Sequence, residues 1–405
     1  MSLVLNEFFS IQNRITAFVP TKFKRYLQVD WNKRLTAIVG TRGTGKTTLV
    51  LQYFKNNFTS VQECLYVSID NPLATKTGIY KIGKEFFTYH GDTIIIDEVH
   101  KQKNWASDIK ALYDEFPNKQ IIILGSSKFN IINQKGDLSR RMLIYNLKGM
   151  SFREFIEFKY EIRINRYSFS EILSDHTEIS AYIQRKIPEI SKYFYEYKQY
   201  GFYPFSQQYS QEEYQSVLHN IIDKIVYEDL PSLKNVKSSS SFTFKKLLAY
   251  LAMSSIPTVV VSNMCNELDI TKETLYEYFD LLNRADVINI IKRKRSSVRS
   301  LRGSRVILLN PNLYYAINKE FWSHHLDKGN IRESFFVSQV DHPLYASEIV
   351  DYTIKINERE IEVEIGRRGK LHHQIKTINN GFVFKDDIEI GYENVIPLYL
   401  MGFLY

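Results

Sequence analysis

The chain has 405 residues, of which 44% are hydrophobic and 24% charged, an ordinary globular composition that excludes a mainly disordered protein. No apolar run reaches the ~18 to 20 residues that span a bilayer, and the N-terminus lacks a secretory signal, so we expect a soluble, cytoplasmic protein of about three domains. Two cysteines are too few for a disulfide framework, and a net charge of +8 permits binding to nucleic acid or acidic lipid without establishing either.

The first part of the chain alternates between short apolar runs and helical patterns, after a basic lead-in at 1–30 that is predicted to be helical. Runs that are apolar along their whole length are typical of strands buried on both faces. Because helical patterns separate these runs, the sequence predicts an α/β fold with a parallel sheet sandwiched by helices. The predicted strands are 35–39, 64–69, 93–96, 120–124 and, as a fifth, 143–147, and the clearest helices are 49–56 and 105–116.

A glycine-rich loop between the first strand and the next helix matches the P-loop pattern G-x-x-x-x-G-K-[ST]. Glycines allow several backbone N–H groups to point at phosphates, at the positive end of the helix that follows. We expect Lys46 to neutralise the β- and γ-phosphates and the Thr47 hydroxyl to bind Mg²⁺. A chance match in a Gly/Thr-rich turn is the alternative, and the flanking strand and helix argue against it. The predicted nucleotide-binding residues are Gly40, Thr41, Arg42, Gly43, Thr44, Gly45, Lys46, Thr47 and Thr48.

Two acidic residues end the third predicted strand in the arrangement of a Walker B motif. Asp97 is predicted to hold Mg²⁺, directly or through water, and Glu98 to orient and deprotonate the attacking water. A strand can end in acids by chance, but the pairing with a P-loop supports the motif. The strand that lies between the two motifs indicates the P-loop class with a catalytic glutamate and argues against the kinase-like and GTPase-like class.

Polar and basic residues after the next strand are candidates to complete the site. Ser126, or Ser127 beside it, is predicted to sense the γ-phosphate, although a helix cap explains either serine equally well. Arg140 or Arg141 is a candidate arginine finger, with a solvated basic pair as the alternative. Weaker candidates near the nucleotide are His100 and Asp70.

Together these residues resemble a family of prokaryotic AAA-type ATPases. Arg42 inside the loop and Trp105 after the acids strengthen the resemblance, because a generic P-loop requires neither. The resemblance implies ATP as the nucleotide, a helical lid with a G-x-x-P turn at 201–204, a winged helix and a small C-terminal domain similar to restriction endonucleases. It divides the chain into a P-loop ATPase core with its lead-in at 1–150, a helical lid at 151–240, a winged helix at 241–320 and a nuclease-like α/β domain at 321–405.

Residues 259–283 have a helix-turn-helix pattern that agrees with a winged helix, and Thr271 is predicted to cap the second helix. A basic hairpin follows, since residues 292–305 contain seven Lys or Arg and no acid. Such a hairpin suits contacts with DNA phosphates, while a protein-docking module with a solvated hairpin is the alternative. The second helix is rich in acids and does not favour DNA. The seven cations are Lys292, Arg293, Lys294, Arg295, Arg299, Arg302 and Arg305.

Four acids, Glu333, Asp351, Glu362 and Glu364, fall where a nuclease core of the PD-(D/E)XK type has its carboxylates. Alternation along a strand places Glu362 and Glu364 on one face, where they could share a divalent metal with Asp351. The nuclease pattern requires a lysine where this chain has Glu364, so a nuclease-like fold kept as a structural or binding module is the favoured interpretation. Candidate substitutes for the lysine are Arg367, Arg368 and Lys370.

The motifs predict a Mg²⁺-dependent ATPase whose nucleotide state reorients the winged helix and the nuclease-like domain. Two alternatives stay open: an ATP-bound DNA-binding or regulatory switch with negligible turnover, and an ATP-gated nuclease. The expected partners are ATP, DNA through 292–305, and a protein partner or a second copy of the chain, with no membrane.

Overall fold

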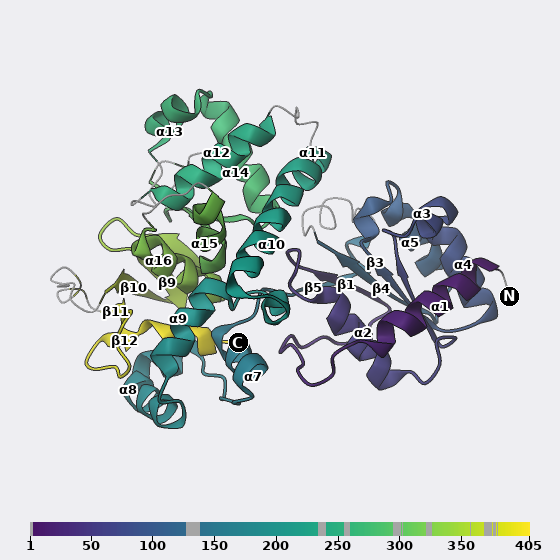
Figure 1. Cartoon of the computed structure of the whole chain (residues 1–405), viewed down its shortest axis with the longest axis horizontal. Coiled ribbons are helices and arrows are strands. Elements are labelled where there is room, and N and C mark those ends of the chain that lie inside the picture. Colours follow the sequence, from purple (N-terminus) through teal and green to yellow (C-terminus); the bar gives the residue numbers. More distant parts are fainter. Residues whose placement is uncertain are drawn as a thin grey trace. The chain divides into compact units, whose positions relative to one another are not determined.

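The computed structural model describes residues 3–405 except 127–137, 234–239, 255–259, 295–300, 302, 321–325, 357, 368–374, 376–377 and 379. The chain forms two compact units, Met1–Gly149 and Met150–Tyr405 (Figure 1). The unit boundary falls beside the predicted end of the core at 150, while the division of the remainder into three domains stays a prediction. No helix in the described parts of the chain is long and apolar enough to cross a bilayer.

The first unit is built on a five-stranded sheet. Its strands are β1 (Leu35–Val39), β2 (Cys64–Ser68), β3 (Thr93–Asp97), β4 (Gln120–Gly125) and β5 (Leu143–Asn146). They lie in the order β2-β3-β4-β1-β5, and every neighbouring pair is parallel. All five end within one residue of their predicted bounds. β1 to β4 are buried nearly throughout, whereas β5 at the edge is more exposed, so the predicted α/β class is confirmed.

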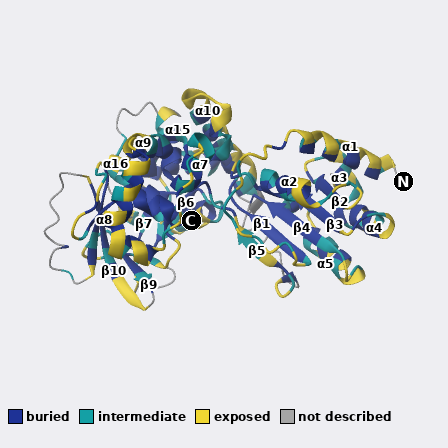
Figure 2. Ribbon diagram, turned by 90° about the horizontal axis from the view of Figure 1, so that it is seen from below, coloured by how far each residue is buried: buried dark blue, intermediate teal, exposed yellow. Residues whose placement is uncertain are grey.

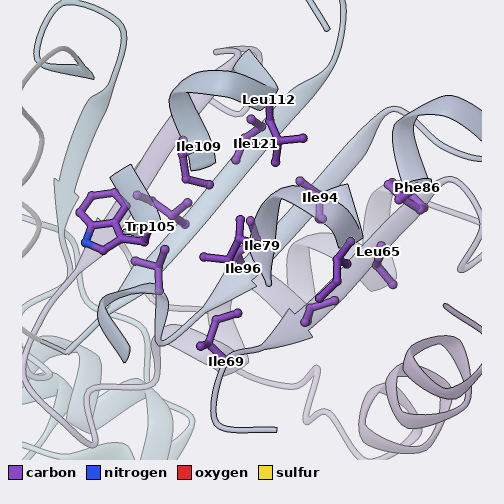
Figure 3. Close-up of a cluster of buried hydrophobic side chains, with 14 of the residues drawn as sticks. Leu65, Ile69, Ile79, Phe86, Ile94, Ile96, Trp105, Ile109, Leu112 and Ile121 are labelled. Atoms are coloured by element: carbon purple, nitrogen blue, oxygen red, sulfur yellow. The ribbon is translucent and has the colours of Figure 1, made fainter. Parts of the chain in front are cut away.

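Helices cover both faces of this sheet. In the first unit they are α1 (Leu3–Ala17), α2 (Lys46–Asn57), α3 (Pro72–Thr77), α4 (Ile79–Tyr89) and α5 (Trp105–Glu115). Because neighbouring side chains of a strand point to opposite faces, the sheet contributes to two hydrophobic cores, one with α4 and α5 and the other with α2. The first core buries Trp105 and Phe86 completely (Figure 3). Figure 2 shows the buried strands between helices whose outer faces are exposed.

The N-terminal lead-in is helical only in its first half, which corrects the prediction of a helix throughout. After α1, residues 18–30 have no regular secondary structure. Pro20 explains the change, because the residue before a proline disfavours the helical conformation. The side-chain amide of Gln12 on α1 donates to the carbonyl of Cys64 and accepts from the N–H of Tyr66, each at 2.8 Å. These two bonds hold α1 along β2 and cover the open edge of the sheet.

The second unit begins with helices, as predicted for 151–240. They are α7 (Phe152–Tyr160), α8 (Phe169–Lys186), α9 (Ile190–Tyr200), α10 (Gln211–Lys224) and α11 (Leu230–Leu233). α7, α8 and α10 each begin with a capping box, in which a serine hydroxyl and a glutamate carboxylate satisfy the first free N–H groups of the helix. The predicted turn at 201–204 follows α9, and the buried side chain of Asn312 accepts a hydrogen bond from the N–H of Phe202 at 2.9 Å.

Three helices and a hairpin follow in the order expected of a winged helix. They are α12 (Ser240–Met253), α13 (Val261–Leu268), α14 (Lys272–Arg284) and the antiparallel strands β6 (Ile288–Ile291) and β7 (Arg305–Leu308), after which comes α15 (Pro311–Glu320). Thr271 caps α14 as predicted, accepting from the N–H of Thr274 at 3.2 Å. Part of the predicted hairpin, including Arg295, Arg299 and Arg302, lies outside the described residues.

The chain ends in a mixed sheet that packs with α16 (Lys328–Gln339), which precedes it in the chain, and with α8. The strands of the sheet are β8 (Leu344–Ala346), β9 (Tyr352–Ile356), β10 (Arg359–Gly366), β11 (Gly381–Lys385) and β12 (Val395–Pro397). β8, β9 and β10 are antiparallel neighbours, whereas β11 and β12 continue the sheet in parallel with β10. An α/β region is therefore present in the C-terminal part of the chain, while its standing as a separate domain and its likeness to a nuclease stay predictions.

Candidate functional site

The P-loop connects β1 to α2 at the carboxyl end of the parallel sheet. Gly45 directly precedes α2 with a φ of 91°, and no side chain caps the helix there. The first N–H groups of α2 therefore have the orientation that binds phosphate at a helix N-terminus. Gly40 begins the loop in a tight place, because a Cβ on it would lie 2.2 Å from the carbonyl oxygen of Leu147. The loop backbone can follow this path only with glycine at position 40.

The lysine of the motif is buried inside the loop. Its Nζ donates to the carbonyl oxygens of Gly40 at 2.8 Å and Thr41 at 3.0 Å. The Thr44 hydroxyl also donates to Thr41, at 2.9 Å, so the loop is closed on itself by side chains. A triphosphate that enters the loop offers Lys46 charged oxygens, and charge-assisted hydrogen bonds are stronger than bonds to neutral carbonyls.

The P-loop and the Walker B strand meet at one carboxylate. Oδ2 of Asp97 accepts hydrogen bonds from the Thr47 hydroxyl at 2.6 Å and from the Tyr66 hydroxyl at 2.8 Å. Oδ1 accepts from the N–H of Glu98 at 2.8 Å. The tertiary structure thus brings together Thr47 and Asp97, the two predicted magnesium ligands, although 50 residues separate them in the chain.

The groups at this point fit a magnesium ion. A threonine hydroxyl and a carboxylate are hard oxygen donors, and their oxygens lie 2.6 Å apart. Mg²⁺ in nucleotide sites is usually held by one or two protein oxygens together with phosphates and water. Within the described residues no group of three His, Cys, Asp or Glu side chains could hold a metal ion by itself, so Mg²⁺ at Thr47 and Asp97 would need the nucleotide as a further ligand.

The catalytic candidate Glu98 has an unusual backbone and a perturbed carboxyl group. Its φ of 51° is left-handed, a conformation that costs roughly 1 to 3 kcal/mol for a residue with a side chain and is common at functional sites. Burial, and then the charge of Asp97, raises the pKa of the Glu98 carboxyl. The cations Lys46 and Arg42 act in the opposite direction. A raised pKa makes the carboxylate a stronger base at neutral pH.

Two polar side chains lie beside this carboxylate. The Ser126 hydroxyl donates to Oε2 of Glu98 at 3.4 Å, and Nε2 of His100 is 3.5 Å from the same oxygen. The structure therefore brings Ser126 and His100 to Glu98, whereas Ser127 lies outside the described residues. Arg141 forms an ion pair with Asp114 on α5 at 3.3 Å, and neighbouring Arg140 is exposed. The arginine-finger assignment stays a prediction.

Tyr66 is a candidate functional residue that the motifs did not identify. It lies on β2, is buried, and donates its hydroxyl to Asp97. Burial, and then Asp97, raises the pKa of the Tyr66 hydroxyl, which stays protonated as a donor. The signal that could have found it is a tyrosine in an otherwise apolar strand, since a buried phenol usually needs a hydrogen-bond partner.

Replacing Tyr66 with Phe is expected to weaken the effect of Mg²⁺ on nucleotide affinity, because Asp97 loses a bond that orients it. Groups that orient metal ligands typically contribute about 10-fold or more to metal affinity. Titrating Mg²⁺ at fixed nucleotide should give a half-saturating concentration about 10-fold above that of the unmodified protein. Tyr53→Phe, which alters a tyrosine stacked on Trp31, is the control. An unchanged Mg²⁺ dependence in Tyr66→Phe would remove this role.

Two of the four acids predicted for a nuclease site pair with an arginine. Nη1 of Arg305, on β7, lies 2.6 Å from Oε2 of Glu333, and Nη2 lies 2.9 Å from Oδ1 of Asp351. The Tyr352 hydroxyl donates to Glu333 at 2.6 Å, and the N–H of Ile365 donates to Asp351 at 2.7 Å. A guanidinium thus occupies the place between two carboxylates that a divalent metal would need.

The shared metal stays an untested alternative, and the ion pairs of Arg305 favour the structural or binding module. Glu362 accepts from the hydroxyls of Ser347 at 2.9 Å and Thr353 at 2.8 Å. In the described part of the chain no cluster of three potential ligands forms around Asp351. Arg367 is exposed, and Arg368 and Lys370 lie outside the described residues. The arrangement agrees with a structural or binding module.

Comparisons with known families agree with the P-loop fold of the first unit. Residues 32–156 match the family described as an AAA domain, and residues 191–319 match a domain of unknown function (DUF8612). The uncharacterized protein MJ1637 of Methanocaldococcus jannaschii is 25% identical over 305 residues, which are 72% of this chain and 63% of that protein. The match thus spans less than two thirds of the relative's length. The first unit contains an AAA-type P-loop domain.

Two solved structures match much of this chain, at low sequence identity and with low TM-scores. The ORC1 protein of Aeropyrum pernix in complex with DNA is 13% identical, with 77% of this chain and 92% of that chain covered and a TM-score of 0.30. AMPPCP-bound DnaA of Aquifex aeolicus is 12% identical, with 70% and 89% covered and a TM-score of 0.25. Scores this low do not extend the likeness to a function.

Proposed function

From the AAA-type P-loop domain of the first unit, we propose that this protein binds ATP with Mg²⁺, hydrolyses it, and uses the nucleotide state to reorient its second unit. The observation that carries the proposal is the 2.6 Å hydrogen bond between Thr47 and Asp97, which joins the P-loop to the Walker B strand. Mg²⁺ supplies positive charge to the β- and γ-phosphates when it is bound.

Each residue of the site has a separate task in this proposal. The loop N–H groups and Lys46 bind the phosphates, and Thr47 and Asp97 hold the metal. Glu98, whose pKa is raised, takes a proton from the attacking water. Ser126 and His100 fix the orientation of the Glu98 carboxylate. Ser126 follows the neighbouring strand β4, and His100 lies in the turn directly after Glu98.

A nucleotide titration tests the binding part of the proposal. Lys46→Ala is expected to weaken the affinity for Mg·ATP about 10- to 100-fold, because hydrogen bonds to charged groups contribute roughly 1.5 to 3 kcal/mol each. Lys55→Ala is the matched control, since Lys55 is an exposed lysine at the other end of the same helix. Equal affinities for the protein and Lys46→Ala would contradict the site.

DNA binding with negligible turnover is the second candidate function. The seven cations and no acid in 292–305, together with the helix–helix–hairpin order, favour it. The described cations Arg293 and Lys294, however, pair with Glu348 and Glu360, so part of this charge is neutralised within the unit. Repeating the nucleotide titration with duplex DNA at two salt concentrations distinguishes this candidate from the proposed ATPase. An ATP-dependent, salt-sensitive DNA affinity without phosphate release would favour the second candidate.

A further inference from the structure

Arg25 lies in the N-terminal segment 18–30, whose position is fixed against α2. The side-chain amide of Gln52, on α2, donates to the carbonyl oxygens of Pro20 at 2.6 Å and Phe23 at 2.8 Å. This segment has no regular secondary structure of its own, so these two bonds hold it on the helix that follows the P-loop. Arg25 follows two residues after the second anchored carbonyl.

The guanidinium of Arg25 joins two backbone segments. Nη1 donates to the carbonyl oxygen of Thr44, inside the P-loop, at 2.6 Å. Nη2 donates to the carbonyl oxygens of Lys148 at 2.8 Å and Gly149 at 3.0 Å, the last two residues of the first unit. A planar guanidinium carries donors in a fixed fork, so one arm can hold the loop while the other holds the end of the unit.

The P-loop and the same end segment also touch directly. The carbonyl oxygen of Leu147 is so close to Gly40 that a Cβ added to this glycine would lie only 2.2 Å from it. The N–H of Leu147 donates to Val39, the residue before the loop, at 2.7 Å. A shift of the loop therefore reaches residues 147–149 through backbone packing as well as through Arg25.

The chain then passes into the second unit through a residue that is held on both sides. The N–H of Met150 donates to the carbonyl of Phe202 at 2.7 Å, and the Tyr197 hydroxyl donates to the carbonyl of Met150 at 2.6 Å. Asn312 supports the same turn, because it accepts from the N–H of Phe202 and donates to the carbonyl of Tyr197. A displacement of residues 147–149 is thus passed along the covalent chain to an anchored residue.

We propose that Arg25 is a positioning residue that connects the P-loop to residues 147–149, so that nucleotide binding at the loop is transmitted to the chain entering the second unit. The proposal rests on the proposed function, since it requires a nucleotide in the loop. Binding of phosphate exchanges the bonds of Lys46 to the carbonyls of Gly40 and Thr41 for bonds to the nucleotide. The loop carbonyls then change partners, and Thr44 carries the change to Arg25.

Hydrogen–deuterium exchange tests this connection in the full chain. ADP is the probe, because its binding involves no turnover, and the readout is exchange in a peptide covering 143–152 with and without ADP. We expect ADP to change this exchange in the unmodified protein. Arg25→Ala and Arg25→Lys should bind ADP but lose more than half of that change, because a lysine ammonium cannot span both segments. Lys24→Ala, at an exposed neighbouring cation, should behave as the unmodified protein.

The outcomes separate this proposal from the proposed function. If the unmodified protein binds no ADP, the nucleotide site itself fails. If it binds ADP while exchange at 143–152 is unchanged, or if both Arg25 variants keep the full change, the connection is refuted. Loss of ADP binding in both variants also refutes the connection, because Arg25 would then be needed for the P-loop to bind nucleotide and not to link it to residues 147–149. Arg25→Lys keeps the charge and guards against a folding defect in Arg25→Ala.

Discussion

Replacing Glu98 with Gln should lower the rate of ATP hydrolysis by about 10²- to 10⁴-fold, the usual contribution of a general base. The amide keeps the size of the carboxylate and can still accept from Ser126, so nucleotide affinity should change little. Phosphate release measured beside the nucleotide titration separates the two effects. Glu7→Gln, at an exposed glutamate on α1, is the matched control. Equal rates in the protein and Glu98→Gln would refute the base.

The pH dependence of turnover gives a second test of Glu98. Burial and Asp97 raise the pKa of this carboxyl above its ordinary value, and the base acts only when it is deprotonated. Activity should therefore be lost as the pH falls through the raised pKa and be retained above it. Glu98→Gln should not show this acidic limb in its residual activity. If Glu98→Gln loses its residual activity at low pH with the same midpoint as the unmodified protein, the titrating group is not Glu98.

Replacing Arg305 with Ala should lower the free energy of unfolding by about 3 to 5 kcal/mol, the usual effect of removing one partner from a buried ion pair. Glu333 would be left buried with Asp351 nearby and no cation between them. Chemical unfolding of the full chain measures the loss. Arg367→Ala, at an exposed arginine directly after β10, is the control. Unchanged stability in Arg305→Ala would show that the pair contributes nothing.

The size of this loss should depend on pH. Burial already raises the pKa of Glu333, and Arg305 opposes that shift, so the variant should raise the pKa further. A carboxyl whose pKa is raised in the folded state binds its proton more tightly there than in the unfolded chain. The variant should therefore be most destabilised above the raised pKa, and the gap to the unmodified protein should narrow as the pH falls through it. Arg305→Met with Glu333→Gln should recover part of the loss, because Glu333 then carries no buried charge, while Asp351 still lacks its cation.

This arrangement also bears on the C-terminal fold. Arg305 belongs to β7 of the hairpin, Glu333 belongs to α16, and Asp351 directly precedes β9. The internal cation therefore ties the hairpin to the mixed sheet instead of leaving the carboxylates to a metal. A strand of the predicted winged helix and the predicted nuclease-like domain are parts of one packed unit.

The amino-acid sequence was enough to predict the strands of the first unit and the residues of the P-loop and the Walker B motif. Both depend on local properties, because an apolar run specifies a buried strand and the glycine and lysine spacing specifies the loop conformation. The contact between Thr47 and Asp97 also agrees with the predicted motifs, because parallel strands bring their carboxyl ends to one edge of the sheet. The helical lead-in was predicted only in part, because periodicity does not show where Pro20 stops the helix.

Which side chains from distant parts of the sequence contact one another could be seen only in the folded chain. Tyr66, Arg25 and Arg305 have no motif around them, and each acts through partners that are far away in the chain. A hydrogen bond or buried ion pair forms only when the distance between its atoms is right to within a few tenths of an ångström. Composition and residue spacing do not predict positions that accurately. The C-terminal acids show the consequence: two of the four carboxylates with the spacing of a metal site, Glu333 and Asp351, pair with an arginine that only the fold brings to them.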